Sequence, residues 1–239
     1  MVDIAANLKR VQRRIWEAAE RAGRDPSEIT LVAVSKMQDA EAILAAYDLG
    51  VRHFGENRVE EASDKIPGVN SKLAQRGGIP PTWHMVGHLQ SRKAKRAVEL
   101  FDIIESVDSL RLAQEINKRC ERKVMHVMLE VNVSGEASKY GFRIGSGAEK
   151  EEFFEAVEGI LALPHLKVQG LMTMAPIVSD PEETRPIFRR LRELRDELRG
   201  RFPESDWPHL SMGMTDDYEV AVEEGATMVR IGRAIFESL

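Results

Sequence analysis

The sequence predicts a closed barrel of eight parallel β-strands surrounded by helices. Two observations lead to this α/β, TIM-type fold class. Short apolar runs alternate with helix-like segments along the chain, and that alternation is typical of a parallel sheet. The runs number eight, and eight parallel strands can close into a barrel that has no edges. An open, doubly wound sheet is the alternative, and it is less common for a chain of 239 residues.

The first expected element is an amphipathic helix over residues 2–22, after which Gly23 and Pro26 interrupt the helical spacing of apolar residues. The clearest later helix spans 181–200. The eight expected strands are 31–36, 53–57, 82–87, 102–108, 124–133, 168–174, 209–214 and 228–232.

Two stretches are rich in Gly, Pro and polar residues and are expected to be irregular: 63–81 and the segment around 141–150. Neither resembles a linker between domains, because composition does not shift on either side of them. One domain over residues 1–239 is therefore expected, with the helix at 2–22 packed on the barrel.

Composition argues against several classes of protein. A net charge of -5 and a pI near 5.8 disfavour nucleic-acid binding, which needs a basic face along the phosphates. A solitary Cys120 permits no intrachain disulfide, which fits a reducing compartment, and a cytoplasmic location is the expectation. No segment approaches the ~20 apolar residues that span a bilayer. The one basic cluster is expected on the solvated side of the first helix and comprises Lys9, Arg10, Arg13 and Arg14.

Polar residues occur near the carboxyl ends of several expected strands. In a barrel of this type the reactive groups gather at that end, where loops surround the open mouth. Since side chains alternate between the two faces of a strand, the inward-facing positions can be chosen from the sequence. They are Lys36, Asn57, His84, Glu130, Asn132, Ser211 and Arg230.

Lys36 is the most suggestive of these positions. It ends the apolar run 31–35 and shares a face with Val32 and Val34, so its amine is expected at an apolar wall. Partial desolvation would lower the pKa of the amine and leave it free to attack an aldehyde. A lysine that reaches from a strand end into solvent is the structural alternative.

The last two strands predict an anion site, since barrels often bind phosphate after strands seven and eight. The residues suited to that task are Ser211, Thr215, Gly213, Gly232 and Arg230. A short helix over 233–237 would add backbone N–H groups. Tight turns and a structural ion pair of Arg230 form the alternative interpretation.

An amine that captures aldehydes and faces a phosphate site suits pyridoxal 5′-phosphate (PLP). Seven segments, in order from about residue 31 to 236, resemble the YggS/PROSC family of pyridoxal phosphate homeostasis proteins. One departure is Arg92, where many relatives have Asn. The segments are AVSKMQ, HFGENRVEE, WHMVGHLQSRKAK, SVDS, VNVSGEASKYGF, GLMTMAP and LSMGMTDDYEVAVEEGATMVRIGRAIF.

The resemblance implies a barrel like the N-terminal domain of alanine racemase, with PLP held as a Schiff base on Lys36. It implies that Ser211, Arg230 and Gly232, with the backbone near Met212, hold the phosphate or ring of the cofactor. It also places Asn57 and His84 at the lining of the pocket.

Several other signals are weaker. His84 and His88 straddle a strand end, so a shared metal ion is not expected. Lys139 is either a second amine at the barrel mouth or a solvated side chain. The pair Asp216–Asp217 is expected to cap a helix. Glu130 either polarises a ligand or pairs with His126 or an interior lysine.

The family resemblance implies a carrier that holds PLP and passes it on, with apo PLP-dependent enzymes as recipients and no catalytic turnover. The chain ends soon after the last expected strand, where related racemases continue into a second domain. A racemase-like enzyme is the first alternative, a Schiff-base aldolase without PLP the second and an interaction module the third. A monomer is expected, because no broad exposed apolar face is evident beyond the first helix.

Overall fold

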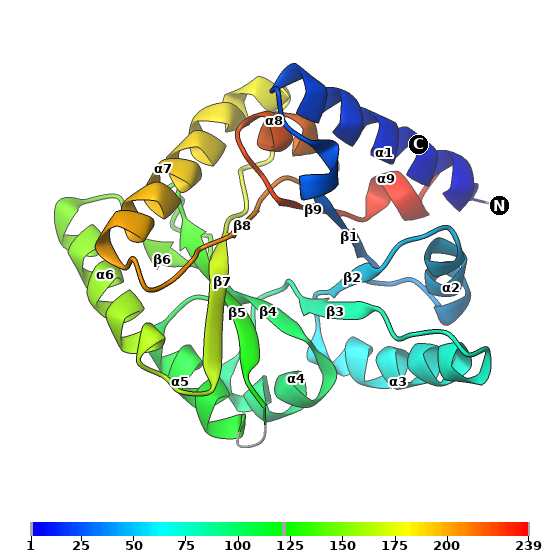
Figure 1. Cartoon of the computed structure of the whole chain (residues 1–239), viewed down its shortest axis with the longest axis horizontal. Helices are drawn as coiled ribbons and strands as arrows, with labels where there is room; N and C mark the ends of the chain where they lie inside the picture. The colour runs from blue at the N-terminus through cyan, green and yellow to red at the C-terminus, as the bar shows by residue number, and fades with distance from the viewer. Residues whose placement is uncertain (1, 121–122, 239) are drawn as a thin grey trace.

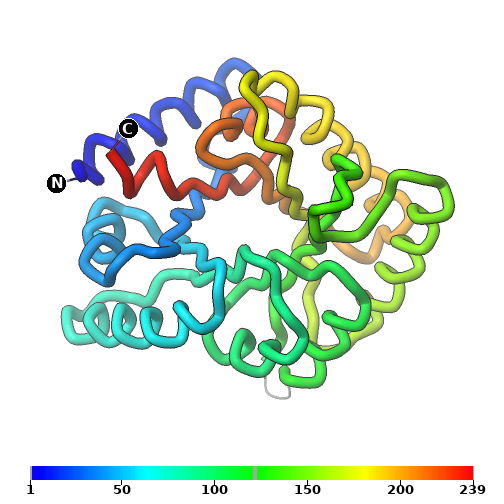
Figure 2. The backbone as a smooth tube through the Cα atoms, turned by 180° about the vertical axis from the view of Figure 1, so that it is seen from behind, coloured from blue at the N-terminus to red at the C-terminus, as the bar shows by residue number. Residues whose placement is uncertain are grey.

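The strands pair in an order that closes on itself, as the computed structural model shows (Figure 1). The structure describes residues 2–120 and 123–238, so the two terminal residues of the expected domain, 1 and 239, lie outside it. The strands meet around a central axis and the helices form an outer ring. Viewed from behind, the same ring is seen with both chain ends at one side of it (Figure 2).

Within the described residues, eight strands form the barrel and all of them pair in parallel. They run in the order β4-β3-β2-β1-β9-β8-β7-β5, and the pairing of β4 with β5 closes the circle. Each expected strand coincides with one of them, so the predicted fold class is confirmed. The barrel strands are β1 Thr30–Val34, β2 His53–Glu56, β3 Thr82–Met85, β4 Ile103–Val107, β5 Met125–Asn132, β7 Leu166–Met172, β8 His209–Ser211 and β9 Met228–Ile231.

The outer layer consists of α-helices joined in places by short 3-10 turns. The expected helix over 2–22 is α1, and the helix expected over 181–200 is a 3-10 turn followed by α7. The turns are η1 Pro26–Glu28, η2 Ser91–Lys93 and η3 Pro181–Thr184. The helices are α1 Ile4–Arg21, α2 Ala40–Asp48, α3 Val59–Gln75, α4 Ala94–Leu100, α5 Leu110–Arg119, α6 Gly147–Leu161, α7 Arg185–Arg201, α8 Tyr218–Glu223 and α9 Arg233–Phe236.

The expectation of an irregular stretch over 63–81 is wrong for residues 63–75, which belong to α3. The helix continues through Pro67 and Gly68 even though these residues cost about 3 and 1 kcal/mol in a helix interior. One face of α3 packs into the core, and the burial of five side chains there outweighs that cost. They are Val59, Ala62, Ile66, Val69 and Leu73.

The segment around 141–150 is also more regular than expected. Phe142–Arg143 form the short strand β6, which pairs with β5. Ser146 caps α6: its hydroxyl accepts the N–H of Glu149 at 3.2 Å, and the Glu149 carboxylate accepts the N–H of Ser146 at 2.9 Å. This capping box was visible in the sequence as Ser-x-x-Glu.

The barrel interior contains an apolar layer followed by a polar one. Glu105, Glu130 and Arg230 are buried, and each lies two residues beyond an apolar residue of the same strand. Because side chains two apart share a face, all three point inward. The apolar layer, against which Ile103 packs, consists of Val32, Met128, Met172 and Met228.

Helix α1 lies against α8 and α9, which brings the two ends of the chain together (Figure 1). Its buried face includes Leu8, Val11 and Ile15. On its other side Arg13 lies 3.6 Å from Glu17 and Arg14 pairs with Glu219 of α8. Lys9, Arg13 and Arg14 are exposed, as predicted, whereas Arg10 is half-buried and donates to Asn7 Oδ1 at 2.7 Å. None of the helices in the described ranges is long and apolar enough to cross a bilayer.

Candidate functional site

A cavity of about 420 Å³ opens beyond the carboxyl ends of the barrel strands, and we call it the mouth cavity. It brings together four of the predicted site residues, Lys36, Asn57, Arg230 and Gly232. The other three, His84, Ser211 and Met212, are buried and do not line it. The lining consists of Val34, Lys36, Asn57, Val86, Met174, Ile177, Met214, Thr215, Asp216, Arg230, Gly232 and Arg233.

Lys36 lies in the turn after β1, and its side chain is exposed. The predicted apolar wall exists, because Val34 and Val86 line the same cavity. The predicted desolvation of the amine is wrong. Strand β1 ends at Val34, so the turn carries Lys36 beyond the buried part of the barrel. The amine is therefore open to a ligand that enters from solvent.

Another part of the mouth cavity carries groups suited to an anion. Gly232 precedes α9, the short helix expected over 233–237, and Arg233 and Thr215 contribute a guanidinium and a hydroxyl. The first N–H groups of a helix attract negative charge. A Cβ atom at Gly232 would lie 3.0 Å from the carbonyl oxygen of Val34, so glycine lets β9 end close to β1.

The expectation that Met212 offers a donor at the end of β8 is wrong. The backbone N–H of Met212 donates to the carbonyl oxygen of Met228 at 3.1 Å, and its side chain is part of the hydrophobic core, so Met212 offers no free donor. Gly213 has a positive φ of 93°, and a Cβ atom there would lie 2.6 Å from that of Ala221. This glycine therefore permits close packing of α8, and its predicted role beside an anion stays a prediction.

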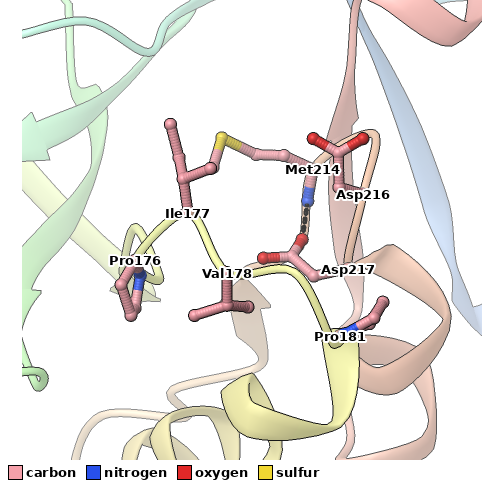
Figure 3. Close-up of a pocket in the computed structure, with 7 residues that line it drawn as sticks. All are labelled: Pro176, Ile177, Val178, Pro181, Met214, Asp216 and Asp217. Carbon is pink, nitrogen blue, oxygen red and sulfur yellow. Dashed lines mark hydrogen bonds between the residues drawn. The ribbon is translucent and has the colours of Figure 1, made fainter.

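A smaller pocket of about 30 Å³ shares Ile177, Met214 and Asp216 with the mouth cavity (Figure 3). It has room for about one water molecule and is too small for a cofactor. The Asp217 carboxylate accepts the N–H of Met214 at 2.6 Å, and Asp216 pairs with Arg233. The prediction that these carboxylates cap a helix holds for the position of Asp217, which is the N-cap residue of α8. It is wrong for the bonding, because the Asp217 carboxylate closes the preceding turn and accepts no N–H of the helix.

A chain of buried hydrogen bonds runs from Arg230 into the barrel. The Arg230 Nη1 donates to Ser211 Oγ at 2.6 Å, and that hydroxyl donates to Glu105 Oε2 at 2.5 Å. The other carboxylate oxygen lies 2.6 Å from Nδ1 of His84, whose Nε2 lies 2.9 Å from Nδ1 of His53. Ser211 and His84 thus support Arg230 from below the cavity.

Glu105 was missed by sequence reasoning, although an acid within the apolar run 103–107 was a usable signal. Burial raises the pKa of Glu105, but the hydrogen bond and charge of His84, with the charge of Arg230, hold that pKa below its ordinary value. Burial lowers the pKa of His53 to about 4. At neutral pH an ionised Glu105 therefore faces a charged Arg230, while His53 is neutral.

Glu130, the other buried glutamate of the barrel interior discussed above, lacks the hydrogen bonds that hold Glu105. Its Oε2 is buried without a hydrogen-bond partner in the described residues. Of the alternatives left open for Glu130, pairing with His126 is excluded because His126 is exposed. Burial, helped by the charge of Asp108, raises the pKa of Glu130 to about 7, against the opposing charge of Arg230. Glu130 therefore changes its protonation state near neutral pH.

We expect Glu130→Gln to flatten the pH dependence of stability. The folded pKa of Glu130 exceeds its ordinary value of 4.5, so the folded protein retains a proton that the unfolded chain has lost. Stability therefore falls as pH rises from 4.5 to about 7. The variant should exceed wild type above pH 7 by roughly 3 kcal/mol. Urea unfolding of both proteins from pH 4.5 to 8 measures this, and parallel curves would contradict it.

The loop after β5 gathers the remaining predicted residues. Asn132 does not face the cavity: its side chain accepts the N–H of Gly135 at 3.0 Å and donates to the carbonyl of Glu136 at 2.8 Å. Lys139 Nζ donates to the carbonyl of Met174, a cavity residue, at 3.1 Å. Lys139 therefore ties this loop to the cavity rim.

His88 and His84 lie in different surroundings. His88 is exposed, and its Nδ1 lies 3.2 Å from Oδ2 of Asp108. Its ring stacks on that of Tyr140, with the ring centroids 3.7 Å apart. His84 is buried against Glu105. The spacing of the two histidines therefore does not bring them to a common ligand.

Comparisons with known proteins agree on one family. Residues 4–238 match a family model described as the N-terminal domain of alanine racemase. A pyridoxal phosphate homeostasis protein of Aquifex aeolicus is 43% identical over 231 residues, which are 96% of this chain and 95% of that protein.

Two solved structures extend the comparison. PipY of Synechococcus elongatus, solved with PLP bound, is 34% identical with a TM-score of 0.78, over 98% of this chain and 100% of that chain. Alanine racemase of Corynebacterium glutamicum has a TM-score of 0.69 at 16% identity, over 98% of this chain and 60% of that chain. At that identity the likeness to the racemase is one of fold alone.

Proposed function

Because the chain belongs to the family of pyridoxal phosphate homeostasis proteins, we propose that it holds PLP in the mouth cavity and passes it to other proteins without catalysing a reaction. The observation that carries this proposal is the shared cavity: the exposed amine of Lys36 and the anion donors of Thr215 and Arg233 line the same space. The PLP bound to PipY supports the choice of ligand.

The lining matches the chemistry of PLP at two places. The Lys36 amine can attack an aldehyde carbon, so that a carbon–nitrogen double bond forms and the aldehyde oxygen leaves as water. The Thr215 hydroxyl and the Arg233 donors that Asp216 does not occupy can hold a phosphate. A cavity of about 420 Å³ also lies within the usual range of about 300–1,000 Å³ for such ligands.

Arg230 can act as a fixed cation for the phosphate or the ring. Its Nη2 donates to the carbonyl of Thr173 at 2.8 Å, and its Nη1 is held by Ser211. With Glu105 behind it, the guanidinium cannot swing away without leaving buried partners unpaired. PLP, when bound, supplies a reactive aldehyde and an electron-withdrawing ring.

A carrier is favoured over an enzyme by the acid–base groups at the cavity. Racemisation of a PLP-bound amino acid needs an acid–base group on each side of the α-carbon, and therefore one besides the cofactor lysine. Among the described residues that line the cavity, Asp216 is the carboxylate, and it is paired with Arg233. The exposure of Lys36 also suits exchange of the cofactor with solvent or with a partner.

The proposal is tested by handover of PLP. The protein is loaded with PLP and mixed with the apo form of a PLP-dependent aminotransferase, while a PLP phosphatase destroys free cofactor. We expect aminotransferase activity to recover with the loaded protein and not with the same amount of free PLP. A parallel incubation with alanine in D₂O should give no α-deuterium above the level of a protein-free control.

Two outcomes would overturn the proposal. Deuterium incorporation by wild type that is absent in Lys36→Ala would identify a racemase-like enzyme. A wild-type protein that shows no imine absorbance with PLP would remove PLP as the ligand and favour an aldolase or an interaction module.

A further inference from the structure

The turn that carries Lys36 has an unusual backbone. It spans residues 35–38 and is closed by the N–H of Gln38, which donates to the carbonyl of Ser35 at 3.0 Å. Met37 has a φ of 61°, in the left-handed region that residues with a Cβ rarely adopt. Such a conformation persists only where surrounding contacts impose it. Contacts from outside the turn must therefore hold Met37 in this conformation.

Two side chains of α3 bind the peptide groups of this turn. Lys65 Nζ donates to the carbonyl of Ser35 at 2.8 Å, and the Glu61 carboxylate accepts the N–H of Met37. Lys65 and Glu61 are in turn joined at 2.9 Å, one helical turn apart. The residues on both sides of Lys36 are therefore held by the same pair of charged groups.

A buried carboxylate completes this arrangement. Glu56, at the end of β2, accepts the hydroxyl of Ser35 at 2.6 Å and the ammonium of Lys65 at 2.9 Å. The side chain of Glu56 is fully buried, and that of Lys65 is 9% exposed. We call Glu56, Glu61 and Lys65 the α3 cluster.

The α3 cluster does not belong to the mouth cavity. Ser35 alternates with Val34 and Lys36 along the chain, so its side chain points to the opposite side of β1, towards α3. The cluster therefore cannot contact a ligand in the mouth cavity. It can act there only through the backbone that carries Lys36.

We propose that Lys65, through the α3 cluster, is a positioning residue that keeps the Lys36 amine aimed into the mouth cavity. The inference rests on the proposed function, in which Lys36 condenses with PLP. An exposed lysine has several rotatable bonds, so a fixed backbone is needed to keep its amine near the aldehyde. Without Lys65 the strained turn can relax, and condensation becomes less favourable.

The test compares two ligands in wild type and Lys65→Met. PLP can condense with Lys36, whereas pyridoxamine 5′-phosphate has the same ring and phosphate and an amine in place of the aldehyde. We expect the affinity for PLP to fall about tenfold, as loss of a charge-assisted hydrogen bond would produce. Affinity for pyridoxamine 5′-phosphate should stay within about twofold. Equal changes for both ligands, or none, would overturn the proposal.

Met37→Gly provides a rescue. Glycine adopts a positive φ without strain, so the double variant Lys65→Met/Met37→Gly should recover most of the lost PLP affinity. The matched control is Lys72→Met, which removes an exposed lysine from the same helix and should change neither affinity. Failure of the rescue would mean that Lys65 does not act through the turn.

A second variant covers the case in which Lys65→Met does not fold. Glu61→Gln weakens the bond to Met37 at a side chain that is 29% exposed, and should lower PLP affinity about threefold while sparing pyridoxamine 5′-phosphate. Borohydride trapping on wild type distinguishes a failure of the proposed function from a failure of the proposed role of the α3 cluster. Absence of an adduct on wild-type Lys36 would remove the proposed function, whereas an adduct with unaffected variants would remove only the role of the α3 cluster.

Discussion

Lys36→Ala is expected to abolish the covalent PLP adduct. Borohydride adds hydride to the imine carbon and converts the Schiff base into a stable secondary amine, which peptide mapping then locates. In wild type we expect the modified peptide to contain Lys36, because this amine is exposed and lines the mouth cavity. The variant should show no modified peptide and no imine absorbance.

The competing residue in this experiment is Lys139. Its Nζ donates to the carbonyl of Met174 at the rim of the mouth cavity, so a rotation of its side chain would bring the amine to the same ligand. Lys139→Ala should leave the adduct in place, and so should Lys95→Ala at an exposed helical position. An adduct that survives in Lys36→Ala and disappears in Lys139→Ala would contradict the assignment.

Glu105→Ala is expected to lower the free energy of unfolding by about 3–5 kcal/mol. The carboxylate is fully buried, binds His84 and Ser211, and lies 4.0 Å from the Arg230 guanidinium. Arginine cannot lose its proton in a protein, so the variant keeps a buried cation without its counter-charge. Urea unfolding near neutral pH measures the change.

The matched control for this prediction is Glu115→Ala. Glu115 forms a 2.6 Å ion pair with Arg119 on the surface of α5, where its side chain is 28% exposed. Because such pairs contribute little, the same chemical change should cost under about 1 kcal/mol there. The double variant Glu105→Ala/Arg230→Met should be less destabilised than the sum of the single changes. Similar losses for both glutamates would show that Glu105 does not balance Arg230.

Part of the candidate site could be predicted from local pattern. Lys36, Asn57 and Arg230 stand at or near strand ends, and alternation along a strand assigns each to the inward face, while Gly232 was expected at the anion site. The same alternation correctly placed His84 and Ser211 inward. It could not tell how deep they lie, so their burial below the cavity was missed.

Local patterns do not predict hydrogen bonds between residues that are far apart in the sequence. Ser211 and Glu105 are 106 positions apart, and only closure of the barrel brings them together. The same is true of Lys65 on α3 and the carbonyl of Ser35, which are 30 positions apart. The Gly, Pro and polar residues of 63–81 predict an irregular stretch, so the sequence does not reveal the helix that carries Lys65.

The sequence by itself determined the barrel, because eight apolar runs and the helical segments between them record which face of each element is buried. It also predicted the end of the barrel at which the mouth cavity opens. Only the tertiary structure decided that α3 continues through Pro67, that Lys36 is exposed and that Glu105 supports Arg230. The physical reason is that periodicity is a local property, whereas burial and pairing depend on which distant surfaces meet.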